Sequence, residues 1–470
     1  AFLRQLHTNN KAAISLNNVG GLTRLFDINR GVRQGCIMAP FLFNIYTNDL
    51  EAHLQILAID SPRIGTKRIP ILLYADDAVL ISRTPGGLQC LINGYTSYMA
   101  NLGLMVNSSK SHTMIISHGV KKRAYSFKSS NSILSPVNFF SYLGILYDTV
   151  GNWGELKLRK VAQFNKGCGA IFNFNTRIGG KPLKPLIEIY RAKCISALVY
   201  GAEIWGYLSP KVFQDEENRF LRRVLRVPPN TSSFMIHEEL GIPYVEDTIA
   251  VKPLLLWLSL WSVEPKHLNR EIISDCLKLA QVNKILWLKY VKSEFTRLGR
   301  SDLFNNPRSC TKLEIREFKQ QFLLSKQMLR EERELVKPSV RSYLPLKTTA
   351  GMEPYLFWTN HNAYHAFLIT RLRFNLILHF LTFPIGWHAQ RNLGPCDCDN
   401  MSEQNIAHFL FFCFNFNVPR KTYLVPILKD FDLRQWKPAL LRLSMVSSPL
   451  VSFALGNFLR SAIRLRSSMN

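Results

Sequence analysis

Two adjacent acidic residues, Asp76 and Asp77, stand between two short apolar runs at residues 71–73 and 78–81. Both runs have the length and β-branched composition of strands, so they predict a hairpin with the carboxylates at its tip. Two like charges between apolar walls need a counter-charge. Mg²⁺ prefers carboxylate oxygens and leaves coordination sites for phosphate, so a metal site for phosphoryl chemistry is one interpretation. An ordinary Asp-Asp turn is the alternative, because Asp is common in turns.

A second cluster, near residue 400, carries side chains that bind softer metals. Cys396 and Cys398 are followed by His408 and Cys413, which is a ligand set of the number and type that tetrahedral Zn²⁺ takes. Two-residue gaps give better chelate geometry than the one-residue gap between the first two cysteines, so cysteines without a metal are the alternative. The predicted role of the ion is to fold a small element that has little core of its own.

The charge of the chain points to a polyanionic partner. The 470 residues include 59 Lys and Arg against 33 Asp and Glu, a formal net charge of +26. Such an excess favours nucleic acid most often and an anionic membrane surface less often. Four arginines with helical spacing are the strongest local candidates for backbone contacts: Arg219, Arg222, Arg223 and Arg226. An apolar stripe of Phe220, Leu221, Val224 and Leu225 predicts that this helix packs on one side. A solvated basic face is the alternative.

The composition excludes several classes of protein. Apolar residues make up 47% and charged residues 20%, as in ordinary globular proteins rather than disordered ones. The 9 cysteines are odd in number and scattered, which favours a reducing compartment over a secreted disulfide framework. No apolar run reaches the ~18–20 residues of a membrane span, so no membrane partner is expected.

The secondary structure predicted around these residues changes near residue 150. Before it, strand-like and helix-like patterns alternate, which predicts an α+β unit. The expected elements are a hairpin around Gly20-Gly21, a helix over 38–57, the carboxylate hairpin, a helix over 87–102 that stops at Gly103, and a strand over 137–146. After residue 150 the apolar positions recur at helical spacing, so the remainder is expected to be largely helical.

Four segments occur in order along the first 150 residues. They are Gly31-Val-Arg-Gln-Gly35 with Pro40-x-Leu-Phe-Asn44, Tyr74-Ala-Asp-Asp77, Leu102-Gly-Leu-x-Val-Asn107 with Lys110, and Tyr142-Leu-Gly144. Together they resemble motifs of the reverse transcriptases of non-LTR retrotransposons: in order, the RQG motif, the catalytic YADD box, the motif that follows it and the primer grip. The segment from His408 to Cys413 is similar to the C-terminal CCHC knuckle of these proteins.

The resemblance implies a role for each matching residue. Asp76 and Asp77 would hold Mg²⁺, with Asp76 the more direct ligand. Lys110 would meet the pyrophosphate as a cation or proton donor, with a solvated lysine as the alternative. Further residues would contact template, nucleotide or primer: Arg33, Gln34, Gly35, Tyr74, Tyr142, Leu143 and Gly144. An ordinary strand and turn is the alternative for the last three, and a surface arginine is the alternative for Arg33.

One departure from the family pattern limits the expected activity. The family palm carries another essential Asp upstream of the RQG helix, whereas Asp27 is the one acidic residue before Arg33 and its surroundings do not match that motif. We therefore expect the C-terminal portion of a longer enzyme that does not polymerise DNA alone. The expected parts are a partial palm over 1–149, a helical thumb over 150–240, a helical region over 241–385, a zinc knuckle over 386–425 and a helical tail over 426–470.

The expected function of the intact enzyme is RNA-templated DNA synthesis by two-metal nucleotidyl transfer. Its partners would be an RNA template, a DNA primer or target and deoxynucleotide triphosphates, in the nucleus and in cytoplasmic ribonucleoprotein. A non-catalytic nucleic-acid-binding remnant that uses the basic thumb and the knuckle is the main alternative. A group II intron-type or telomerase-like polymerase is a third. The sequence leaves the oligomeric state open.

Overall fold

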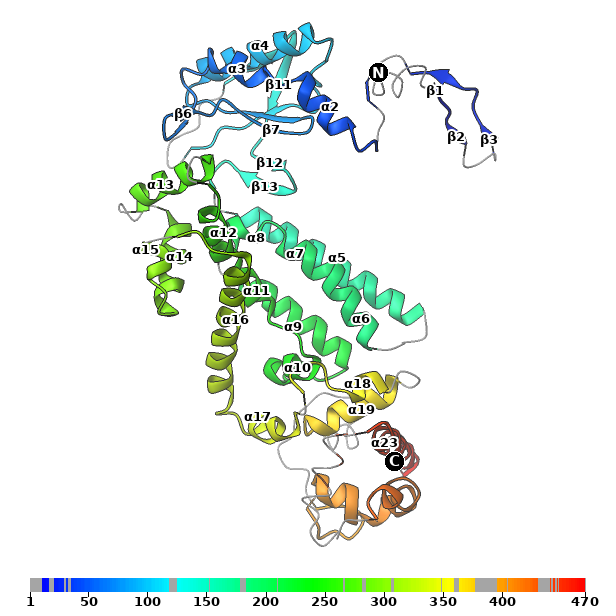
Figure 1. The fold of residues 1–470 in the computed structure, drawn as a ribbon. Helices are drawn as coiled ribbons and strands as arrows, with labels where there is room; N and C mark the ends of the chain where they lie inside the picture. The colour runs from blue at the N-terminus through cyan, green and yellow to red at the C-terminus, as the bar shows by residue number, and fades with distance from the viewer. Residues whose placement is uncertain are drawn as a thin grey trace. The chain divides into compact units, whose positions relative to one another are not determined.

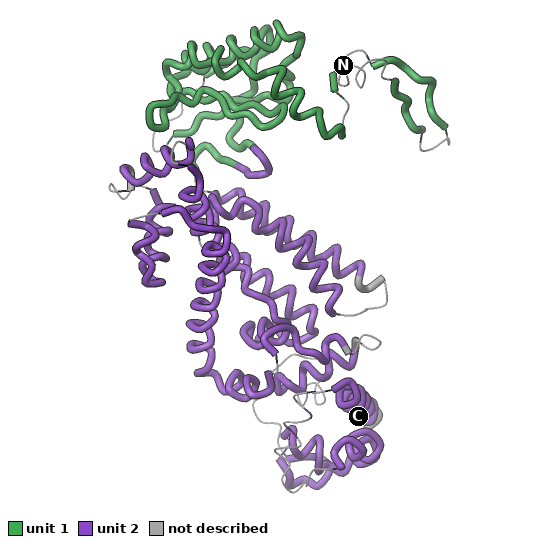
Figure 2. Tube along the Cα trace, viewed as in Figure 1, with its two compact units in different colours: residues 1–141, 147–151 green, residues 142–146, 152–470 purple. Residues whose placement is uncertain are grey.

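The chain contains both helices and sheet and forms two compact units (Figure 1). Unit 1 contains residues 1–141 and 147–151, and unit 2 contains residues 142–146 and 152–470 (Figure 2). The finer division into five parts stays a prediction. The computed structural model describes residues 11–16, 21–28, 31–32, 35–117, 125–151, 153–177, 183–208, 210–264, 267–280, 285–305, 308–347, 349–358, 363–376, 395–403, 405–429, 440, 443, 446 and 448–469.

Unit 1 is built around the predicted carboxylate hairpin. Strands β7 (Ile71–Tyr74) and β8 (Asp77–Leu80) pair antiparallel, with Ile71 opposite Leu80 and Tyr74 opposite Asp77. Helices α3 (Leu50–Gln55) and α4 (Pro85–Asn101) lie together on one face of it (Figure 1). Their shared core consists of Leu50, Leu54, Ile71, Leu91, Tyr98 and Met99. The hairpin is therefore anchored by apolar packing at the end away from its acidic tip.

The ends of α4 follow from local sequence. The Thr84 side chain caps its start by accepting a hydrogen bond from the Gly87 amide, a common N-cap arrangement. Gly103, in the left-handed region at φ 70°, ends it, as predicted. Gly94 permits close packing, because a Cβ at that position would lie 2.3 Å from Leu57 Cδ1.

Two predicted elements of unit 1 are divided in the structure. The helix expected over 38–57 is two helices, α2 (Ala39–Tyr46) and α3, because the polar run after Tyr46 interrupts it and the Thr47 hydroxyl donates to the Phe43 carbonyl. The strand expected over 137–146 belongs to a hairpin of β12 (Phe139–Tyr142) and β13 (Ile145–Asp148).

The other strands of unit 1 are short. The hairpin predicted near Gly20 is confirmed in its described part, where β1 (Lys11–Ala12) pairs with β4 (Phe26–Asp27) and β2 (Ser15–Leu16) pairs with β3 (Gly21–Leu22). The remaining strands are β5 (Arg63–Ile64), β6 (Lys67–Arg68), β9 (His112–Thr113), β10 (Phe127–Ser129) and β11 (Ser132–Pro136).

Unit 2 is helical from residue 154 through most of its described length. The first half contains α5 (Gly154–Arg177), α6 (Leu183–Ile189), the π-helix η1 (Tyr190–Ile195), α7 (Ser196–Val199), α8 (Ala202–Trp205), α9 (Lys211–Leu225), α10 (Ser233–Leu240) and α11 (Val245–Ala250). The second half contains α12 (Lys252–Trp261), α13 (Leu268–Ala280), α14 (Leu286–Arg297), α15 (Asp302–Asn305), α16 (Lys312–Glu334), α17 (Pro338–Tyr343), α18 (Tyr355–Trp358), α19 (Ala363–Arg373) and α23 (Pro449–Met469). Single turns lie between α17 and α23: η2 (Leu344–Leu346), η3 (His408–Phe412), η4 (Phe414–Phe416), α21 (Asn417–Pro419), η5 (Arg420–Leu424) and η6 (Val425–Ile427).

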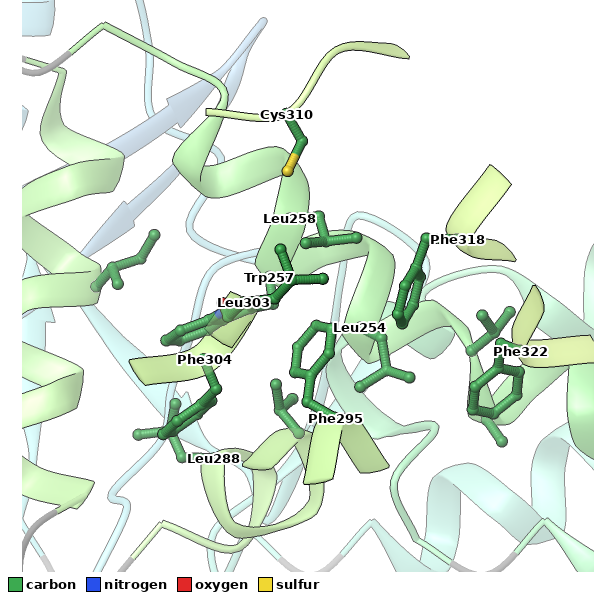
Figure 3. Packing of buried hydrophobic residues seen from close by; sticks show 14 residues of the cluster. Leu254, Trp257, Leu258, Leu288, Phe295, Leu303, Phe304, Cys310, Phe318 and Phe322 are labelled. Carbon is green, nitrogen blue, oxygen red and sulfur yellow. The ribbon is translucent and has the colours of Figure 1, made fainter. Parts of the chain in front are cut away.

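An aromatic core joins α12 to the helices that follow it (Figure 3). The Trp257 ring stacks on Phe304 with centroids 4.9 Å apart, and its indole nitrogen donates to the Leu303 carbonyl at 3.0 Å. Phe295 of α14 meets Phe318 of α16 with centroids 5.2 Å apart. Burial of such large rings stabilises this helical region. The candidate site residues lie elsewhere in the chain.

Candidate functional site

The two carboxylates occupy the tip of the β7–β8 hairpin. Asp76 and Asp77 are both exposed, and the turn before them places Ala75 in the left-handed region at φ 51°. Tyr74 is 63% exposed beside them. Burial and the nearby charge of Asp76 raise the pKa of Tyr95, which lies on α4. The hairpin thus presents two carboxylate groups side by side at its exposed tip, and carboxylate oxygens are ligands that Mg²⁺ prefers.

Other predicted residues of unit 1 are placed in part. Arg33 and Gln34 lie outside the described residues, whereas Gly35 follows them at φ 81°. The Lys110 side chain is exposed, and its amide donates to the Asn107 side chain at 3.2 Å. This hydrogen bond belongs to a local turn that positions the Lys110 backbone. Asp27 has a different environment, because its carboxylate lies 3.8 Å from Lys11 Nζ in the β1–β4 ladder.

The predicted primer grip forms the turn between β12 and β13. Leu143 and Gly144 occupy the two central positions at φ 49° and φ 75°. Two positive φ values in a two-residue turn are typical of a tight hairpin whose twist matches its strands. Residues 142–146 group with unit 2, and the Tyr200 hydroxyl donates to the Leu143 carbonyl at 2.9 Å. The motif is therefore a tight turn that a tyrosine of unit 2 contacts by a hydrogen bond.

The four candidate arginines of α9 have different surroundings. Arg222 is half-buried and its Nε donates to the Thr231 carbonyl at 3.0 Å, so it supports the fold. Arg219 is exposed and pairs with Glu216 at 2.7 Å. Arg223 and Arg226 are exposed and lie over aromatic rings, Phe172 at 4.3 Å and Phe367 at 4.5 Å. The predicted apolar stripe is buried, with all four of its residues at 6% exposure or less.

The four predicted zinc ligands converge. Single donor atoms of Cys396, Cys398, His408 and Cys413 all lie within 4.8 Å of one another. The Cys396 and Cys413 sulfurs are 3.7 Å apart, and Cys398 Sγ is 3.2 Å from His408 Nε2. A tetrahedral ion with Zn–S bonds of about 2.3 Å sets its sulfurs about 3.8 Å apart. Three sulfurs and one nitrogen in this arrangement fit Zn²⁺.

The surroundings of the quartet also suit a metal. Burial raises the pKa of the Cys413 thiol to about 12 and raises that of Cys396. A bound cation opposes this effect, because it favours the thiolate that coordinates it. Across the part of the chain that the structure describes, no other group of three or more His, Cys, Asp or Glu side chains has this geometry. Asp76 and Asp77 therefore have no third described ligand at their tip.

Comparisons with known proteins identify the domain that contains the carboxylate hairpin. The family model described as reverse transcriptase (RNA-dependent DNA polymerase) matches residues 4–146. The chain is 28% identical over 193 residues, 39% of its length, to a Pol polyprotein from the type-1 retrotransposable element R2 of Popillia japonica. It is 30% identical over 281 residues, 56% of its length, to the Pol polyprotein of element R2DM of Drosophila melanogaster. The chain carries a reverse transcriptase domain of the non-LTR retrotransposon class.

The match to relatives extends beyond the reverse transcriptase domain itself. An RNA-directed DNA polymerase from the mobile element jockey of Drosophila melanogaster is 20% identical over 261 residues, 52% of the chain. The chain spans about a quarter of these relatives, 26%, 25% and 27% of their lengths. Among the residues searched, no helix is both long and apolar enough to cross a membrane.

Sequence reasoning missed the residues that support the quartet and the grip turn. Arg420 donates to the Cys413 carbonyl at 2.6 Å, and Arg466 of α23 pairs with Asp397 at 2.8 Å. Arg420 contacts a candidate ligand through its backbone, and Arg466 contacts the residue between Cys396 and Cys398, so both hold the chain around the quartet. Arg466 and Tyr200 are far along the chain from their partners, and no local pattern signals these pairs.

Proposed function

We propose that this chain supplies the catalytic carboxylates and the primer grip of an enzyme that copies RNA into DNA. The observation that carries the proposal is the exposed Asp76-Asp77 pair at the tip of an anchored hairpin, within a reverse transcriptase domain. Asp76 and Asp77 hold Mg²⁺, which when bound supplies charge stabilisation and activates the primer 3′ hydroxyl. Lys110 offers a cation to the departing pyrophosphate. Arg33, Gln34, Gly35 and Tyr74 position template and nucleotide.

The remaining regions, in this proposal, hold nucleic acid. Residues 150–240 act as a thumb whose exposed Arg219, Arg223 and Arg226 contact the phosphate backbone. Residues 386–425 form a zinc knuckle that binds RNA or target DNA, and its support is the S₃N donor set within 4.8 Å. The intact protein works with RNA, a DNA primer and deoxynucleotide triphosphates, in cytoplasmic ribonucleoprotein and in the nucleus.

Metal binding by the full chain tests the carboxylate assignment directly. Mn²⁺ replaces Mg²⁺ as a probe, and its binding is followed by electron paramagnetic resonance with an RNA template, a DNA primer and a deoxynucleotide triphosphate present. We expect Asp76→Asn and Asp77→Asn to weaken Mn²⁺ binding, whereas Asp60→Asn, in the same unit, leaves it unchanged. Equal binding by all four proteins would remove the proposed site.

The non-catalytic remnant remains the second candidate, favoured by the lack of a third ligand beside Asp76 and Asp77 among the described residues. Mn²⁺ binding that depends on Asp76 and Asp77 favours the incomplete enzyme over this remnant. Primer extension on an RNA template tests a different question, whether the chain polymerises DNA by itself. We expect the chain alone to bind a primer–template without extending it. Extension that Asp76→Ala abolishes would contradict this expectation and establish the chain as a sufficient polymerase.

A further inference from the structure

The turn that carries the primer grip has a conformation that its own residues do not favour. Leu143 lies at φ 49°, in the left-handed region that residues with a Cβ rarely adopt. A backbone held in this way persists when surrounding contacts fix it. The contacts around Leu143 therefore decide how firmly the turn is held.

Tyr200 supplies two of these contacts. Its hydroxyl donates to the Leu143 carbonyl at 2.9 Å, across 57 residues of sequence. Its ring lies against Gly144, where a Cβ would be 3.1 Å from Tyr200 Cε1. Glycine at 144 therefore serves the positive φ of the turn and also the close approach of this ring.

The backbone of Tyr200 is itself held by hydrogen bonds from a buried lysine. Lys160 of α5 is buried, and its ammonium group donates to the carbonyls of Ala197 and Tyr200, both at 2.9 Å. The same nitrogen lies 5.7 Å from the Tyr200 ring centroid and 5.6 Å from that of Trp205, within cation–π range. Lys160 thereby supplies donors to two carbonyls where α7 ends, and the Trp205 indole nitrogen also donates to that of Tyr200 at 3.4 Å.

Gly201 brings the same segment against the strand that leaves the turn. It lies at φ 73°, and a Cβ there would be 2.0 Å from Ile145 Cδ1. Tyr200 and Gly201 thus contact three consecutive residues, Leu143, Gly144 and Ile145. The junction between α7 and α8 therefore packs directly against the turn.

We propose that Tyr200 is a positioning residue, which holds the primer-grip turn through its hydroxyl bond to Leu143 and so sets the binding of a recessed primer 3′ end. This inference rests on the proposed function, because it takes the turn to be the primer grip. The bond acts at the primer end only. Contacts to the duplex body, which depend on phosphates, do not pass through the turn.

The test measures end-specific binding by the full chain. Fluorescence anisotropy gives Kd for a DNA primer recessed on an RNA template and for a heteroduplex of equal length with both ends capped by hairpins. We expect the wild type to prefer the recessed end. Tyr200→Phe, which keeps the ring and loses the hydroxyl, should reduce this preference by about twofold to fivefold, the scale of one exposed hydrogen bond.

Tyr290→Phe is the matched control, because the Tyr290 hydroxyl also donates to a backbone carbonyl of unit 2, that of Ala250, at 2.7 Å. It should keep the preference. Amide hydrogen exchange should quicken at residues 143–146 in Tyr200→Phe alone.

Each result decides a separate question. A wild type without preference for the recessed end overturns the grip assignment, and this inference with it. A wild-type preference that Tyr200→Phe leaves intact, or that both variants reduce equally, overturns the role of Tyr200 while the proposed function stands.

Discussion

At the scale of single residues, the two candidate metal sites differ in how far side chains alone define them. The quartet of Cys396, Cys398, His408 and Cys413 brings four donors within 4.8 Å. The tip of the carboxylate hairpin offers only the two carboxylates of Asp76 and Asp77 among the described residues. Residue type and spacing predicted both candidates, because thiolate and imidazole groups bind Zn²⁺ and carboxylates bind Mg²⁺. The four sulfur and nitrogen donors converge as predicted, whereas the Mg²⁺ site stays a prediction.

Zinc content is the first prediction at this scale. The purified chain should contain one Zn²⁺, and His408→Ala or Cys413→Ser should lose it, because three ligands hold the ion much less tightly than four. Elemental analysis and thermal unfolding provide the measurements. Cys90→Ser, an exposed cysteine of α4, is the control and should keep both the metal and Tm. The prediction would be contradicted if the wild-type protein contained no zinc and its Tm did not change when a chelator was added.

Lys160 gives a prediction for pH dependence. Burial lowers its pKa from the usual 10.5 to about 8. Between these two values the unfolded chain binds a proton that the folded chain has released, so the free energy of unfolding contributed by this group rises with pH. Lys160→Met should therefore show a shallower rise from about pH 8 to pH 10 in urea unfolding. Lys166→Met, an exposed lysine on the same helix, should keep the wild-type slope.

At the scale of elements, sequence patterns predicted what local spacing controls. The strands over 71–73 and 78–81 and the helix that stops at Gly103 follow from apolar period and from one glycine. The buried stripe of α9 follows from the same period. The division of the helix at Thr47 was missed, because a threonine hydroxyl that bonds a backbone carbonyl leaves no periodic signal.

The grip hairpin shows the limit of local patterns more clearly. Residues 137–146 have strand-like composition throughout, and leucine does not indicate a left-handed turn. Tyr200, which contacts the turn through the Leu143 carbonyl, lies outside any window around the motif. Local patterns therefore predict the motif but neither the bend at Leu143 nor the tertiary contact beside it.

Gly201 provides a prediction for this contact between elements. Gly201→Ala should destabilise the chain by more than about 2 kcal/mol, because the new Cβ meets Ile145 in addition to the cost of a positive φ. Gly299→Ala isolates the second cost, since Gly299 lies at φ 69° with no neighbouring atom within 4 Å. Gly299→Ala should lower the free energy of unfolding by about 1 kcal/mol. Denaturant unfolding gives both values.

A second substitution identifies the cause. Ile145→Val removes the Cδ1 atom that the new Cβ would meet, so the double variant with Gly201→Ala should recover part of the stability. Equal destabilisation by Gly201→Ala and Gly299→Ala would show that the approach to Ile145 carries no cost.

At the scale of the whole molecule, the net charge of +26 predicts binding that depends strongly on salt. The affinity for an RNA–DNA duplex should fall linearly on a log–log plot against salt concentration. Replacing Arg219, Arg223 and Arg226 together by Ala should reduce the slope by about one for each phosphate that these arginines neutralise. Arg222 is left in place, because its bond to Thr231 supports the helix.

The control for charge alone is an exposed arginine of α16, Arg316. Arg316→Ala should lower the affinity slightly and keep the slope. An unchanged slope in the triple variant would mean that α9 is a solvated face, and that the positive charge acts elsewhere on the chain.

The bond between Tyr200 and Leu143 has a consequence for the order in which the chain is made. A ribosome adds Leu143 well before Tyr200, since 57 positions separate them. The β-hairpin therefore emerges into solution without the side chain that supports its tightest bend, and it must wait for the following helices to form. Nascent chains arrested before that tyrosine should expose this loop to proteases, and longer ones should protect it.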